Sequence, residues 1–283
     1  MQKSTIVALG LALSVLNLTA QSFFESFDAP GTLASDFNVF QNATPPAGSP
    51  FLQVSTGGVG NSGGVSVSGA TNVTADATMI QKNTVFDFSK VGVTLTISAM
   101  INVSAQTSTG NKILQLGFVN ANTNGLNSND GTAFTSLRLL STAASGNVYA
   151  SQYQTKVAAG TTSVTSANLA NNISLLVGEW YEVSGSFINL GGGQILAKGF
   201  VQDFGTSGVF PESVIYTFPT TVLTSADIAA DSSVYAALRG FNSDGLHTVD
   251  NLTAVMVVPE PGTFSLVLLG LAGFAARAWK RKS

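Results

Sequence analysis

The sequence contains no cysteine and a single histidine, His247. Without cysteine the chain has no disulfide, no thiolate nucleophile and no cysteine-bound metal, so its folded part must be held by its own core. One histidine cannot form a histidine-rich zinc site. A lone histidine in a loop before the final predicted strand is more often a surface residue than the base of a Ser-His-Asp triad.

Charge is also scarce, at 10% of residues. Setting aside Lys3 and the four C-terminal cations leaves 7 of the 12 basic residues against all 15 acidic ones, a net charge of −8. An acidic surface repels phosphate backbones, which argues against a nucleic-acid partner and leaves a divalent cation or a neutral polymer open. The 45% hydrophobic content, regularly alternating, predicts a folded chain.

Residues 1–22 are predicted to be a secretory signal peptide. A short cationic start precedes an apolar core over residues 5–18. Ala20 and Ser22 place small residues at the −3 and −1 positions of a cut after Ser22. A cut after Ala20 and an N-terminal anchor that is never removed stay open.

Residues 258–283 combine three ordered features: a proline-flanked tetrapeptide, an uncharged run over 262–276, and a basic end that includes Trp279. The prolines keep the tetrapeptide extended and accessible to a protease. The uncharged run is shorter than the ~20 residues that span a bilayer unaided, but the terminal cations and Trp279 are typical cytoplasmic and interfacial anchors. The tetrapeptide consists of Val258, Pro259, Glu260 and Pro261.

This order of motif, apolar segment and basic cluster resembles the PEP-CTERM sorting signal of Gram-negative bacteria. The resemblance implies recognition by exosortase, a membrane protease thought to cut near the Pro-Glu-Pro motif. The alternative is an ordinary C-terminal membrane anchor. Both interpretations place the preceding residues outside the cytoplasm, in the envelope or the extracellular matrix.

Residues 23–257 are predicted to form an all-β domain with almost no helix. The clearest strand is 93–103, where apolar and polar residues alternate, as in a half-buried antiparallel sheet. The pattern G-x-G-x-x-G at 58–63 lacks a βαβ context and is interpreted as a flexible turn. A helical turn is predicted at 224–230, and strands at 51–54, 65–68, 113–119, 134–140, 147–154, 180–189, 195–204, 214–218, 234–241 and 248–257.

So many strands in one contiguous length predict an antiparallel β-sandwich of two packed sheets. The hairpin 180–204, turning through three glycines at 191–193, supports this. The segments 178–181, 202–208 and 247–252 resemble the concanavalin A-like, laminin-G-like jelly rolls.

The candidate chemistry is sparse. Glu179 and Glu182 are three residues apart on a strand, which points them to opposite faces, so they cannot flank one glycosidic bond. The Glu-x-Asp-x-x-Glu motif of jelly-roll glucanases is absent. We therefore expect no catalytic site, with a glycoside hydrolase as the remote alternative.

Sugar rings stack on exposed aromatic faces, and Tyr149, Tyr153 and Trp180 are the candidates for such a platform. Tyr149 and Tyr153 share one face of their strand, because they are four residues apart. The alternative is that these side chains belong to the core. The sequence thus leaves a structural or adhesive protein and a carbohydrate-binding module both open.

The resemblance to jelly-roll modules also implies a structural calcium ion joining the terminal strands through Glu25 and Asp250. Calcium takes six to eight oxygen ligands, so backbone carbonyls and Asn251 or Asp28 would have to complete the shell. The alternative is a pair of solvated acids at the rim of a sheet.

Overall fold

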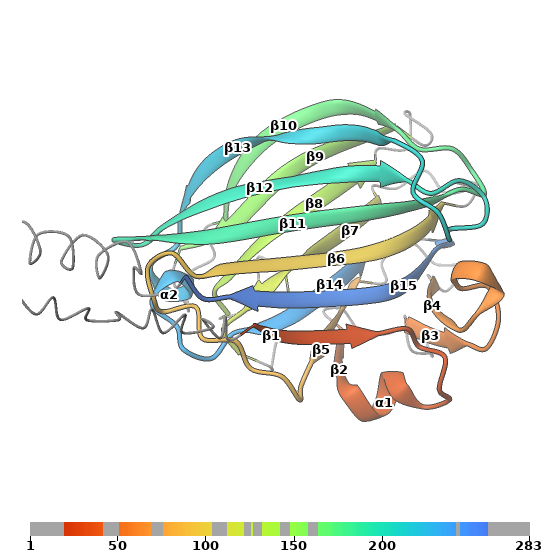
Figure 1. Ribbon diagram of the computed structural model, residues 1–283, viewed down its shortest axis with the longest axis horizontal. Coiled ribbons are helices and arrows are strands. Elements are labelled where there is room, and N and C mark those ends of the chain that lie inside the picture. The colour runs from red at the N-terminus through yellow and green to blue at the C-terminus, as the bar shows by residue number, and fades with distance from the viewer. Residues whose placement is uncertain are drawn as a thin grey trace, which may run out of the picture. The chain divides into compact units, whose positions relative to one another are not determined.

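Two antiparallel sheets lie face to face in the structure, a computed structural model (Figure 1). It describes residues 20–41, 51–68, 76–103, 112–121, 126, 132–141, 148–157, 164–241 and 244–259. Residues Ala20–Val257 form one compact unit. The predicted all-β sandwich is confirmed.

One sheet has eight strands. In spatial order they are β13 (Val214–Thr224), β12 (Gln194–Asp203), β11 (Trp180–Gly191), β6 (Thr94–Val103), β15 (Asp244–Val257), β4 (Gly64–Ser68) and β3 (Phe51–Val54), with β1 (Gln21–Glu25) paired to β15. The first and last strands are therefore neighbours, as expected for the terminal strands of a jelly roll.

The other sheet has seven strands. In order they are β10 (Val164–Ser174), β9 (Val148–Lys156), β8 (Phe134–Ser141), β7 (Lys112–Val119), β14 (Tyr235–Phe241), β5 (Asp76–Gln81) and β2 (Phe37–Gln41). Short helical turns are α1 (Thr32–Asp36), η1 (Val59–Asn61) and α2 (Ala226–Ala229). The last of these lies within the helical turn predicted at 224–230.

The core fills the space between the sheets, and the alternation of each strand decides which residues enter it. In β6, Leu95, Ile97 and Ile101 are buried, as the period of two predicted. Across the interface, Phe118 of β7 meets Phe187 of β11 edge to face with ring centroids 6.2 Å apart. Even-numbered residues of β7 and odd-numbered residues of β8 and β9 therefore face inward, and the alternate residues face outward.

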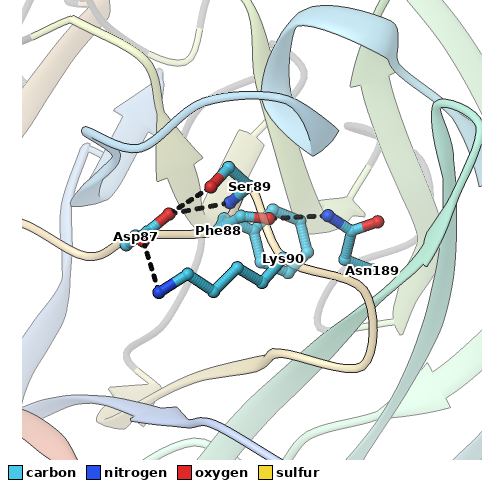
Figure 2. A network of polar contacts seen from close by, with 5 residues as sticks. All are labelled: Asp87, Phe88, Ser89, Lys90 and Asn189. Atoms are coloured by element: carbon cyan, nitrogen blue, oxygen red, sulfur yellow. Dashed lines mark hydrogen bonds and ion pairs between the residues drawn. The ribbon is translucent and has the colours of Figure 1, made fainter.

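One pole of the sandwich is held together by Asn189, near the end of β11 (Figure 2). Its buried amide donates to the carbonyl oxygen of Phe88 at 2.6 Å and to that of Ala229 in α2 at 2.7 Å. The neighbouring turn is closed by Asp87, which accepts a hydrogen bond from Ser89 Oγ at 2.5 Å and pairs with Lys90 at 3.4 Å. A single amide thus links strand, loop and helical turn.

The leader over residues 1–19, the apolar run 262–276 and the tetrapeptide residues Glu260 and Pro261 lie outside the described residues. Within the described part, no helix is both long and apolar enough to cross a membrane. Val258 and Pro259 follow directly on β15.

Candidate functional site

The predicted aromatic platform is wrong, because all three rings are buried. Tyr149 and Tyr153 share one face of β9, as predicted, but it is the inner face, where they are 2% and 0% exposed. Tyr153 packs edge to face against Phe187 and Phe218 of the opposite sheet, with centroids 6.4 and 6.2 Å apart. These tyrosines are core residues and present no face to a sugar.

Trp180 is 4% exposed and is covered by the loop after β12. A Cβ added at Gly208 would lie 2.8 Å from the indole Cγ, so this glycine permits the loop to lie directly on the ring. An open depression of about 400 Å³ borders the indole and is lined by backbone and small polar side chains, including Asn61, Asn102 and Ser207. Trp180 forms part of the wall of this depression and does not project into solvent.

Asp250 in β15 is a fully buried acid that contacts the glycine-rich loop 57–63. The carboxylate Oδ2 accepts hydrogen bonds from the Val59 backbone N–H at 2.8 Å and from Ser62 Oγ at 3.1 Å, and Oδ1 accepts from the Asn251 N–H at 2.6 Å. The register of β15 shifts directly after Asp250, which lies opposite Met100, and Asn251 at this bulge has a φ of 49°. Burial raises the pKa of Asp250, and the hydrogen bonds from Val59 and Asn251 partly oppose that rise.

The G-x-G-x-x-G segment is held by this acid. A Cβ at Gly58 would meet Gly63 O at 1.7 Å and Asp250 Oδ2 at 2.7 Å, so the two glycines allow the loop to close on itself and on the carboxylate. Asp28 binds the other end of the loop by accepting from the Gly63 N–H at 2.9 Å. The predicted turn is present, and two carboxylates anchor it.

The residues around Glu25 and Asp250 do not fit a calcium ion. The oxygens of Asp250 are occupied by N–H and O–H donors, and Glu25 accepts from the Phe27 N–H at 2.6 Å. Among the described residues, no three acids or histidines gather into a group that could hold a metal. The first and last strands are joined instead by the antiparallel ladder between β1 and β15.

The candidate catalytic groups are also separated. Glu179 accepts a hydrogen bond from the Tyr181 hydroxyl at 2.8 Å, whereas Glu182 lines a depression with Phe24 and Met100 on the outer face of the eight-stranded sheet. The backbone of His247 is part of β15, opposite Val103, and so lies in a strand where a loop was predicted.

Among the described residues, a hydrogen-bonded set of polar side chains lies on the outer face of the seven-stranded sheet. Arg239 Nη1 donates to Gln115 Oε1 at 3.2 Å, and Gln115 Nε2 donates to Ser136 Oγ at 2.7 Å and Gln154 Oε1 at 3.3 Å. Gln154 Nε2 continues to Ser166 Oγ at 3.0 Å. A second link joins Gln152 Nε2 to Asn168 Oδ1 at 2.6 Å. We call this set, together with Arg138, which pairs with both Gln115 and Gln152, the polar row.

Strand register explains why these residues meet. Arg239 pairs with Gln115, Gln115 with Arg138, Arg138 with Gln152, and Gln152 with Asn168, so one residue from each of five adjacent strands stands in line. Residues opposite one another in a sheet project on the same side, which is here the side away from the core. The polar row therefore crosses β14, β7, β8, β9 and β10 at right angles to the strands.

Exposure increases along the polar row. Gln115 is fully buried and Arg239 is 9% exposed, Arg138 and Gln152 are half-buried, and Asn168 is exposed. Burial, and next the charge of Arg239, lowers the pKa of Arg138 to about 10. Access to the row is therefore open at β8, β9 and β10.

Sequence reasoning missed the polar row. The strands 113–119, 134–140 and 147–154 were predicted, but only their aromatic residues were considered as binding residues. The available signal was Gln115, Arg138 and Gln152, which interrupt the apolar character of three predicted strands at outward positions.

The family model of the PEP-CTERM protein-sorting motif matches residues 257–282. The chain ends in a PEP-CTERM sorting motif. This motif begins on the last residue of β15 and includes the predicted tetrapeptide Val258 to Pro261. Such a motif implies an exported protein that is directed to the cell envelope. No curated protein sequence matches the chain.

Solved structures share the fold at low sequence identity. The CBM2 module of the evolved Dit of Lactobacillus casei BL23 phage J-1 has a TM-score of 0.50 and 11% identity, covering 86% of this chain and 99% of that one. The lectin UEA-II complexed with galactose has a TM-score of 0.48 and 12% identity, with 84% and 99% covered. Endo-1,3-beta-glucanase from Streptomyces sioyaensis has a TM-score of 0.49 and 10% identity, with 85% and 97% covered. The domain thus has the antiparallel two-sheet sandwich fold that it shares with the CBM2 module.

Proposed function

We propose that this protein is a non-catalytic, adhesive component of the Gram-negative envelope or extracellular matrix, whose sandwich binds a matrix polysaccharide along the polar row. Exosortase recognises the C-terminal motif, and the apolar run 262–276 holds the precursor in the inner membrane before processing. The observation that carries the proposal is the line of amides and guanidinium groups that strand register places across five strands.

The chemistry of the row suits a saccharide. A sugar hydroxyl donates and accepts, and Gln, Asn and Arg side chains offer planar donors and acceptors in fixed directions. The row is already ordered by its internal hydrogen bonds, so binding needs little further loss of side-chain freedom. A straight row at right angles to the strands also suits an extended chain better than a compact ligand.

Co-sedimentation with the polysaccharide fraction of the native host matrix tests this proposal. Replacing both Gln152 and Asn168 by alanine removes the accessible amides and should lower retention at least fivefold. The matched control replaces Gln194 and Gln202, two amide residues of β12 in the eight-stranded sheet. Equal retention of both double variants, with unchanged melting temperatures, would refute binding at the polar row.

A further inference from the structure

We propose that the polysaccharide bound along the polar row is acidic, and that its carboxylate or sulfate groups dock on Arg138 with Arg239 behind it. This inference rests on the proposed function, because it specifies the ligand class of the same site. The exported domain as a whole is acidic, so two cations on one sheet face oppose the character of the rest of the chain.

Register brings the two guanidinium groups together. Arg239 on β14 and Arg138 on β8 both pair with Gln115 on β7, so they lie two strands apart, about 10 Å between Cα atoms at ~4.8 Å per strand. Both side chains project on the outer side, and arginine is long enough to span much of that separation. The charges therefore converge above Gln115.

The surroundings favour an anion. Burial and the like charge of Arg239 are what lower the pKa of Arg138, and no carboxylate contributes to it. Arg138 Nε is buried and finds no acceptor within the described part of the chain. The side chain as a whole is only half-buried, so a carboxylate or sulfate that reaches this guanidinium would accept charge-assisted hydrogen bonds from it.

The neighbouring groups indicate a glycan as the carrier of this anion. Gln152 and Asn168, next to Arg138 in the row, are suited to hydroxyl groups. A nucleic acid fits the row less well, because the row contains no aromatic side chain on which bases could stack. The expected ligand is a chain that repeats both hydroxyls and acidic groups.

Calorimetric titration of the exported domain with oligogalacturonate and with its fully methyl-esterified form tests the inference, because the two probes share a backbone and differ in charge. We expect the acid form to bind at least tenfold more tightly, with an affinity that falls as salt concentration rises. Arg138→Gln should abolish that preference, and Arg138→Lys should restore only part of it, since lysine lacks the bidentate fork. Lys198→Gln, which removes an exposed cation of β12, is the matched control and should bind as the wild type does.

The outcomes separate the two proposals. Equal affinity for both probes, with Gln152 and Asn168 still required, overturns the acidic ligand and leaves saccharide binding at the row intact. An acid preference that survives Arg138→Gln also overturns the inference. Binding of neither probe, together with no retention on host polysaccharide, overturns the proposed function and this inference with it.

Discussion

Buried polar residues, more than hydrophobic ones, give this sandwich its individual features. Asp250 orders a glycine-rich loop, Asn189 ties one pole, and Gln115 connects the polar row. Each of these side chains forms hydrogen bonds that water would otherwise supply. Replacing one of them therefore leaves its buried hydrogen-bond partners unsatisfied. These residues are the most informative targets for mutation.

Ionisation of Asp250 should make stability depend on pH. Its pKa is raised above the ordinary value of 3.8, so the native state binds more protons than the unfolded state between that value and the raised one. The free energy of unfolding should therefore fall as pH rises through that window. Denaturant titrations from pH 3.5 to 7 should show the fall in the wild type and a smaller one in Asp250→Asn. A steeper fall in the variant would contradict this assignment.

Truncation of Tyr153 should affect stability and not binding. Tyr153→Ala should lower the free energy of unfolding by about 3–5 kcal/mol, as expected when a large core ring is removed. Tyr153→Phe is the matched control, because the hydroxyl is buried and finds no hydrogen-bond partner among the described residues. This variant should lie within about 1 kcal/mol of the wild type. Loss of polysaccharide retention in a stably folded Tyr153→Phe would contradict the core role.

At the scale of elements, strands with clean alternation were predictable and polar strands were not. The strand predicted at 93–103 begins one residue later in the structure, and 51–54 is reproduced. The missed strands β2, β5 and β10 belong to the seven-stranded sheet, and β10 carries the polar sequence VTSANLANNIS at an edge. The burial of the aromatic side chains could not be predicted either. The alternation of a strand shows which residues share a face, but it does not show which face packs against the other sheet.

The hairpin between β11 and β12 depends on its glycines, as predicted. Gly191, Gly192 and Gly193 all have positive φ, and Gly192, at 60°, has open space around its missing Cβ. Gly192→Ala should therefore lower the free energy of unfolding by roughly 1–2 kcal/mol through backbone strain alone. Gly192→Asn should cost less, since asparagine tolerates this conformation. Thermal unfolding of both variants provides the comparison, and equal losses would argue against backbone strain as the cause.

At the scale of the whole molecule, the sorting motif predicts processing at residues 258–261. Mass spectrometry of protein released from the cell should find C-termini within this tetrapeptide, and intact Ser283 would contradict processing. Deleting residues 262–283 should leave the sandwich folded, because β15 ends at Val257, while sorting to the envelope is lost. Circular dichroism of the truncated protein is the control that separates loss of sorting from loss of folding.

The position of β15 has a mechanical consequence. This strand is bonded to β6 on one side and to β1 and β4 on the other, and the chain leaves it directly for the sorting motif. Traction applied at the C-terminus acts along the strand, whereas its ladder hydrogen bonds run across the strand. The force is then shared by many ladder hydrogen bonds that are loaded in parallel, and these bonds do not break one after another. A protein pulled between its C-terminal attachment and a polymer gripped on the opposite sheet would resist extraction of its last strand.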